Sequence, residues 1–199
     1  ESVFAAYGNL IRSLVRMGKE NPNLLKFLIA SAVYRDGLNG VFAYGAVLGG
    51  LAFGLDLTEI IIFGIAANVV AGSGAFVGAF FEDRIGSRKV VFISLAGVIL
   101  GGLGVFVFAG AGVIAFFGFG LFLCTLVGPA QSASRARMSR LSADDKQGEA
   151  FGLYATTGRA VSFLAPAAWT ILVGLFSPLW GIIGLMVILL IGFILLMSV

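Results

Sequence analysis

Six long apolar stretches follow one another along the chain, and they restrict its fold more than any other feature. A membrane-spanning helix needs about 20 mainly apolar residues, or about 30 Å at about 1.5 Å per residue. A membrane-spanning β-strand would appear instead as a short segment of alternating polarity. The sequence therefore predicts an all-α membrane protein with six transmembrane helices. They cover approximately residues 24–54, 58–81, 90–109, 112–128, 150–175 and 178–199.

The composition indicates that lipid surrounds these helices. Of the 199 residues, 59% are hydrophobic and 12% are charged, whereas soluble domains have about 45–50% apolar and about 25% charged residues. The chain has one Cys and no His, which excludes a His/Cys zinc cluster and a Ser-His-Asp triad. We expect no metal, no cofactor, no enzymatic activity and no nucleic-acid partner.

The basic residues predict how the helices are oriented in the membrane. Lys and Arg lie before the first apolar stretch, between the second and third, and between the fourth and fifth, whereas the other three connections have none. Cytoplasmic loops of membrane proteins are rich in Lys and Arg. We therefore expect a multi-pass protein of the plasma (inner) membrane, with both ends of this segment in the cytoplasm.

Residues 1–23 differ from the six apolar stretches. On a helix drawn through them, apolar residues share one face, and Arg12, Arg16 and Lys19 lie on the other. We interpret this segment as an amphipathic helix at the membrane interface. The alternative is a helix packed on a cytosolic protein surface. Because the chain begins with Glu and its last apolar stretch has no basic flank, we expect the six helices to belong to something larger.

Polar residues interrupt three of the predicted spans. Arg35, Asp36 and Asn39 lie in the first span, Asn68 lies in the second and Arg159 lies in the fifth. An Arg or Asp near the bilayer centre costs about 2.5–3.5 kcal/mol, so such side chains usually face protein or water. We expect the first and fifth spans to flank a water-accessible cavity where these five residues bind substrate. The arginines would attract an anionic group, and Asp36 would carry a proton.

Each of these residues also has a structural interpretation. Either arginine could place its guanidinium group among the lipid headgroups. Asp36 could form a buried ion pair with Arg35 or Arg159, and Asn68 could form a hydrogen bond between helices.

The connection between the second and third spans carries a motif, GAFFEDRIGSRK, over residues 78–89. It resembles the signature loop of the major facilitator superfamily, G-x-x-x-D-R-x-G-R-R/K. Asp83, Arg84 and Gly86 match, while Ala79 replaces the first glycine and Ser87 is inserted before Arg88 and Lys89. In that family the loop gates alternating access, so the resemblance implies a gating role for Asp83, Arg84, Gly86 and Arg88, with Gly86 permitting a tight turn. The alternative is a basic cytoplasmic loop without such a role.

The second half of the chain is similar to one branch of that family. Residues 131–135 read QSASR, residues 149–154 read EAFGLY, and residues 158–159 read GR. These segments resemble the C-terminal half of transporters of the vacuole-effluxer-like branch. Helix capping and the ordering of a loop would also explain these residues. The resemblance implies that the chain supplies helices seven to twelve of a twelve-helix transporter, with residues 1–23 as the linker between its two halves.

Together these patterns predict a proton-coupled secondary active transporter that works by alternating access. It would move a small polar or anionic solute, with amino acids as the class that the branch name suggests. Its expected partners are the lipid bilayer, the solute and a second six-helix half, in the same polypeptide or another copy. The alternative is a non-transporting membrane subunit that stabilises a larger complex.

Overall fold

In the computed structural model, residues 16, 21–142 and 147–199 are described, and every regular element among them is helical. The prediction of an all-α fold is therefore confirmed. The interfacial helix predicted over residues 1–23 lies outside the described residues, apart from Arg16 and residues 21–23. The elements are α2 (Pro22–Phe53), α3 (Leu57–Ile85), α4 (Ser87–Val107), the 3-10 turn η1 (Ala109–Ala111), α5 (Val113–Leu141), α6 (Gln147–Ala160), α7 (Leu164–Leu175) and α8 (Trp180–Met197).

Five helical stretches in the described part of the chain are long and apolar enough to cross a membrane. They are α3, α4, α5, the pair α6–α7 taken together, and α8. The remaining helix, α2, is 32 residues long, but Lys26, Arg35 and Asp36 make it less apolar. Each of the six predicted spans overlaps a helix, and five of them overlap the stretches that are apolar enough to cross a membrane.

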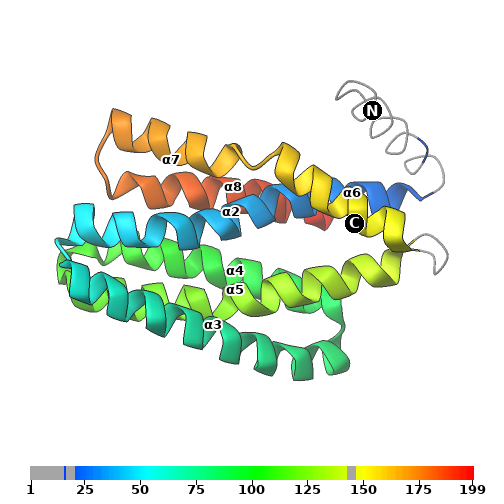
Figure 1. Ribbon diagram of the computed structural model, residues 1–199, viewed down its shortest axis with the longest axis horizontal. Coiled ribbons are helices and arrows are strands. Elements are labelled where there is room, and N and C mark those ends of the chain that lie inside the picture. Colours follow the sequence, from blue (N-terminus) through cyan, green and yellow to red (C-terminus); the bar gives the residue numbers. More distant parts are fainter. Residues whose placement is uncertain (1–15, 17–20, 143–146) are drawn as a thin grey trace.

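The helices form two groups that lie side by side (Figure 1). One group contains α2, α8 and α6–α7, and the other contains α3, α4 and α5. Contacts of α2 with α5 and of α4 with α8 join the two groups, so one hydrophobic core extends through both. The start of α2 and the end of α8 lie at the same end of the bundle, as an even number of spans requires.

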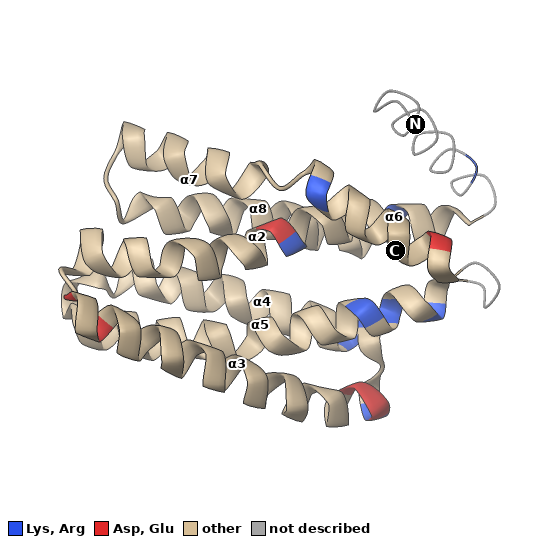
Figure 2. Cartoon of the chain, in the orientation of Figure 1, with Lys and Arg blue, Asp and Glu red and all other residues tan. Residues whose placement is uncertain are grey.

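Lys and Arg are concentrated at one end of the bundle (Figure 2). Lys and Arg gather where α3 joins α4 and where α5 ends, and we call this the basic end. Asp56 and Glu59 lie at the opposite end. The Asp56 side chain accepts a hydrogen bond from the Glu59 amide (2.8 Å), and the Glu59 side chain accepts one from the Asp56 amide (3.0 Å). Between the ends, charged residues lie midway along α2 and at the end of α6 next to α7.

Helix α5 is longer than the sequence predicts. The apolar pattern ends near residue 128, whereas the helix continues to Leu141 and is followed by Ser142, whose side chain donates to the Met138 carbonyl (3.0 Å). Three Ala and three Arg residues follow Pro129 in this helix, and both residue types favour helix whether or not lipid surrounds them. Hydropathy therefore locates the apolar part of α5 but does not detect its polar continuation.

A turn at residues 161–163 divides the fifth predicted span into α6 and α7. Pro166, the third residue of α7, has no amide hydrogen, and in a continuous helix its ring would clash with the carbonyl of Ser162. The turn lies just before this proline. As a consequence, the first amide groups of α7 have no acceptor within their own helix.

Glycines allow α3 and α5 to cross in close contact. A Cβ atom on Gly74 would overlap the Thr125 carbonyl group, and a Cβ atom on Gly78 would overlap the ring of Pro129. The Thr125 carbonyl lacks its usual helical donor because Pro129, four residues later, has no amide hydrogen. The missing side chain at Gly74 therefore creates the space that this carbonyl occupies.

We expect Gly74→Ala to lower the free energy of unfolding by about 1–3 kcal/mol, because the added methyl group overpacks the crossing. Thermal unfolding of the purified protein in detergent would measure the change. Gly72→Ala is the matched control, because it lies on the same helix with open space around it. It should leave the melting temperature unchanged or slightly raised, since Ala favours helix over Gly. Equal melting temperatures for both variants would contradict the close crossing.

Candidate functional site

Arg35 of α2 contacts α6 directly. Its Nη1 atom donates a hydrogen bond to the Tyr154 carbonyl (3.0 Å), and its Cζ atom lies 3.8 Å from the centre of the Tyr154 ring. A guanidinium group can stack on an aromatic ring and donate to a carbonyl at the same time. The sequence predicts that the first and fifth spans flank a cavity, whereas in the structure they touch at Arg35.

Asp36 binds the start of α7. Its side chain is buried, and its Oδ2 atom accepts a hydrogen bond from the amide of Ala165 (2.6 Å). The carboxylate therefore supplies an acceptor that the turn at residues 161–163 removes, and its charge is favourable at a helix N-terminus. Among the described residues, neither Arg35 nor Arg159 forms an ion pair with Asp36.

Two tyrosines and a serine join three helices next to these charges. The hydroxyl groups of Tyr34 and Ser134 lie 2.6 Å apart, and those of Ser134 and Tyr154 lie 2.7 Å apart. All three residues are buried. Ser134 and Tyr154 belong to the segments QSASR and EAFGLY, so these segments meet at a buried hydrogen-bonded contact between α2, α5 and α6.

Arg159 is exposed near the end of α6. It is the thirteenth residue of the 29-residue stretch Gln147–Leu175, so it lies near the middle of that candidate span. No carboxylate in the described ranges forms an ion pair with it. Lipid exposure of Arg at this depth would be costly, so we expect this face of α6 to meet water or another protein surface.

Three side-chain amides surround a hollow of about 420 Å³. They belong to Asn39 of α2, Asn68 of α3 and Gln131 of α5, and the rest of the lining is mainly small or apolar. Asn68 donates to the Gly64 carbonyl (2.8 Å), whereas within the described residues no protein group forms a hydrogen bond with the Asn39 or Gln131 amide. The structure thus brings two predicted site residues together and adds a third.

Sequence reasoning missed Gln131 as a site residue because the predicted fourth span ends at residue 128, which placed Gln131 in a loop. The signal that could have identified it is the helical continuation of α5 past Pro129. A prediction that the helix continues past Pro129 would have placed the Gln131 amide inside the bundle rather than in a loop beyond it.

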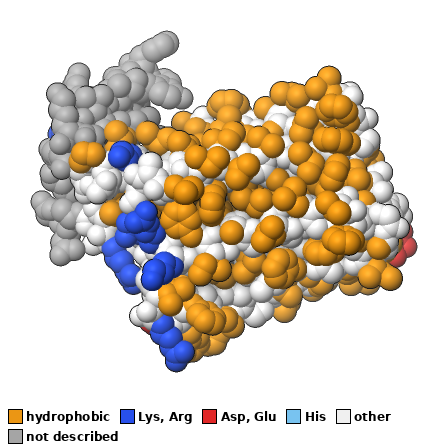
Figure 3. Space-filling view, turned by 180° about the vertical axis from the view of Figure 1, so that it is seen from behind, with side chains coloured by type: hydrophobic (Ala, Val, Ile, Leu, Met, Phe, Trp, Pro, Cys, Tyr) orange, Lys and Arg blue, Asp and Glu red, His pale blue; other side chains and the backbone are white. Residues whose placement is uncertain are grey.

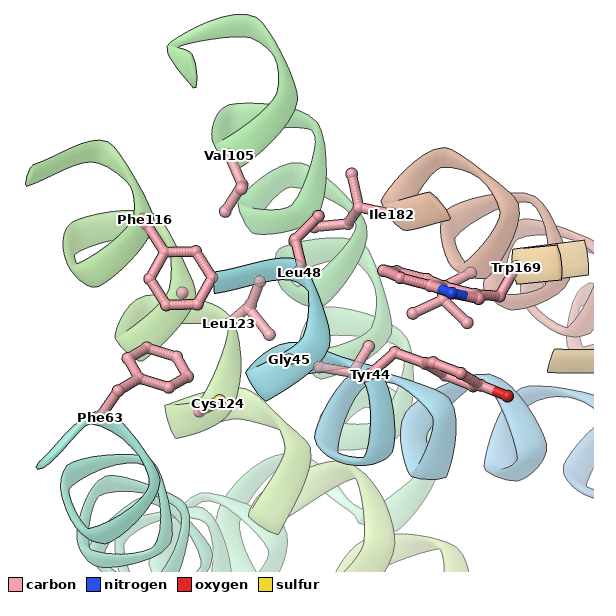
Figure 4. Close-up of a pocket in the computed structure, with 13 residues that line it drawn as sticks. Tyr44, Gly45, Leu48, Phe63, Val105, Phe116, Leu123, Cys124, Trp169 and Ile182 are labelled. Atoms are coloured by element: carbon pink, nitrogen blue, oxygen red, sulfur yellow. The ribbon is translucent and has the colours of Figure 1, made fainter. Parts of the chain in front are cut away.

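A second, smaller cavity of about 30 Å³ is almost entirely apolar (Figure 4). Tyr44 of α2 and Trp169 of α7 stack beside it with ring centres 4.7 Å apart, and Phe63 of α3 and Phe116 of α5 pack with ring centres 4.5 Å apart. A cavity of this size holds about one water molecule. These aromatic residues therefore join four helices and leave no room for a solute between them.

The motif at the turn between α3 and α4 lies at the basic end. Gly86 has φ +85°, which confirms the predicted tight turn. Residues other than glycine rarely adopt this backbone conformation. Asp83, Arg84 and Arg88 are exposed. Glu82, one residue earlier, forms an ion pair with Arg140 of α5 (3.3 Å), so a charged contact joins the ends of α3 and α5.

Comparison with known proteins identifies the family. The Major Facilitator Superfamily model matches residues 37–199, which include α3–α8 and most of α2. No curated protein matches the chain.

We expect Ser134→Ala to lower the free energy of unfolding by about 1–3 kcal/mol, because it leaves two buried tyrosine hydroxyls without their shared partner. Chemical or thermal unfolding of the purified protein would measure the loss. Ser132→Ala is the matched control on the same helix, since its hydroxyl donates to the Pro129 carbonyl of that helix (3.2 Å). Equal stabilities for the two variants would contradict a structural role for the contact.

Proposed function

The chain belongs to the major facilitator superfamily, whose members are transporters and not enzymes, and we propose that it moves a small polar or anionic solute through a twelve-helix bundle of which it forms helices seven to twelve. It is an integral, multi-pass membrane protein. Amino acids are the proposed solute class, because the segments QSASR and EAFGLY resemble the vacuole-effluxer-like branch. The proposed mechanism is secondary active transport by alternating access.

The observation that carries this proposal is the hollow lined by three amides. Amide groups donate and accept hydrogen bonds, so Asn39, Asn68 and Gln131 suit a polar solute. Two of these amides have no protein partner in the described part of the chain, which leaves them available to a ligand. Solute sites of transporters built from repeats lie near the membrane midplane, where the repeats meet.

A second six-helix half is supported by the surfaces of α3 and α6–α7. These stretches bury far fewer of their residues than α4, α5 and α8 do. The exposed Arg159 lies on one of them, and a protein or water interface would satisfy its charge. We propose that the second half, in the same polypeptide or another copy of this chain, covers the surface of α6–α7 that carries Arg159 and the face of α3 that carries Asn68.

The charged residues of α2 and α6 have proposed roles around the solute. Arg35 and Arg159 supply positive charge for an anionic group. Asp36 carries the coupled proton: protonation would remove the negative charge that holds the start of α7, so the angle between α6 and α7 could change with proton binding. This links the buried carboxylate to movement of a helix.

The turn between α3 and α4 is the proposed gate. Asp83, Arg84 and Arg88 are exposed there and available to helix ends of the second half, while Gly86 permits the turn. By the positive-inside rule, the basic end faces the cytoplasm, and the plasma membrane is the proposed location.

One observation favours the alternative of a non-transporting membrane subunit. Asp36 is buried against α7, and Arg35 is engaged by Tyr154, so both charges already have protein partners. If these contacts only stabilise the bundle, the chain would serve as a structural part of a larger complex.

We expect Asn39→Ala and Gln131→Ala each to reduce transport about threefold to tenfold, the effect of losing one hydrogen bond to an uncharged group. Uptake of a mixture of radiolabelled amino acids into proteoliposomes containing the full polypeptide would measure it. Asn23→Ala, at the exposed start of the same helix as Asn39, is the control. Undiminished uptake by both the Asn39→Ala and the Gln131→Ala variant would contradict the proposed solute site.

We expect Asp36→Asn to keep the fold, because the amide oxygen can still accept a bond from Ala165, and to abolish accumulation driven by a pH gradient. Solute exchange at equal pH needs no net proton movement and should persist. Asp36→Ala, which removes the acceptor, should in contrast destabilise the protein by about 1–3 kcal/mol.

Both activities are measured in the same proteoliposomes, and folding is checked by thermal unfolding. If Asp36→Asn accumulates solute against a gradient as the wild type does, the proton role is wrong. If it loses exchange and accumulation together, Asp36 acts on binding or structure rather than on coupling.

A further inference from the structure

An apolar groove separates α3 from α4 near the basic end. Both helices pack extensively on α5 and contact each other far less, so α5 forms the floor of the groove. Its volume is about 580 Å³. Its lining includes Val77 and Phe81 of α3, Ile93 of α4 and Pro129 of α5.

The walls of this groove suit a hydrocarbon chain. Val77, Phe81 and Ile93 are 51%, 53% and 60% exposed, so their apolar surfaces are not covered by this chain. Pro129 on the floor packs closely against Gly78, which keeps α3 and α5 together beneath the open space. The groove is therefore an apolar channel with a fixed floor.

Two cations lie at the end of the groove. Arg84 follows Phe81 by three residues and Val77 by seven, so it shares the face of α3 that lines the groove. Lys89 precedes Ile93 by four residues and shares the corresponding face of α4. Because Gly86 turns the chain between them, both side chains are brought to one end. Figure 3 shows Lys and Arg as a band at this end, beside hydrophobic side chains.

These cations have a surplus of positive charge around them. Among the described residues, Arg84 and Lys89 have no carboxylate within 4.0 Å, since the ion pairs there join Arg16 to Glu149 and Arg140 to Glu82. Nearby, the charges of Arg88 and Arg140 act on Arg137, and the buried Nε atom of Arg137 has no hydrogen-bond acceptor. In the described segments 82–89 and 135–140, six Lys and Arg residues therefore outnumber the two carboxylates, those of Glu82 and Asp83.

We propose that this groove binds an anionic glycerophospholipid. One acyl chain lies between α3 and α4, and the phosphate group lies against Arg84 and Lys89. A soluble anion would use only the cations, and a zwitterionic lipid would add its own positive charge to a site that already has too much. Basic sites between transmembrane helices are suited to anionic headgroups. The proposal gives Arg84, which is also a proposed gate residue, a lipid contact on the outer surface of this chain, and it rests neither on the gating role nor on transport.

The test is lipid binding to the purified full chain in detergent, measured by native mass spectrometry with phosphatidylglycerol and with phosphatidylcholine of identical acyl chains. We expect phosphatidylglycerol to bind more tightly. Replacing both cations, Arg84→Gln with Lys89→Gln, should reduce this preference roughly tenfold or more. The matched control is Lys26→Gln with Arg135→Gln, which removes the same charge from exposed positions of α2 and α5 outside the groove and should keep the preference.

A second variant tests the acyl-chain part. Val77→Trp should fill the groove and lower the affinity for both lipids, whereas Ile65→Trp, exposed on the same helix outside the groove, should not. Thermal unfolding confirms that each variant folds. The proposal is overturned if the Arg84 and Lys89 double variant keeps its preference, if the control pair loses as much, or if Val77→Trp binds phosphatidylglycerol as tightly as the wild type.

Discussion

The arrangement of the bundle depends on how the backbone groups freed at the break between α6 and α7 find hydrogen-bond partners inside a membrane. Lipid offers no hydrogen bonds, so backbone groups freed by a broken helix must find partners in the protein. Asp36 provides one by accepting from the Ala165 amide at the start of α7. This requirement places a carboxylate midway along α2 and brings α2 against α6–α7. The contacts of Arg35 and Tyr34 then follow from the same close approach.

The polar groups of α2 consequently serve two purposes on neighbouring faces. Arg35 and Asp36 are used within the chain, where they contact α6 and α7. Asn39, one turn further along α2, instead lines the hollow together with Asn68 and Gln131. A movement that changed the angle of α7 would act on α2 through Asp36, one turn from the hollow. Helix geometry thus offers a short physical connection between the proposed proton site and the proposed solute site.

Much of the fold could be predicted from the sequence, while the partners of the polar side chains could not. Hydropathy locates the spans because lipid exposure acts on each residue separately. Arg35 and Asp36 are adjacent in the chain, yet their partners, Tyr154 and Ala165, lie more than a hundred residues away. Helix periodicity gives the direction of a side chain on its own helix but not the helix that meets it. Gln131 was missed for a related reason, because the end of an apolar pattern was taken as the end of a helix.

The sequence by itself determined that this chain is a helical membrane protein, that its basic residues lie at one end, and that Gly86 turns between two spans. Each of these depends on local composition or on the conformation of one residue. Only the tertiary structure decided that Asp36 caps a broken helix rather than pairing with an arginine, and that three amides meet at one hollow. Those outcomes depend on how helices pack against one another, and packing is a property of surfaces contributed by distant parts of the chain.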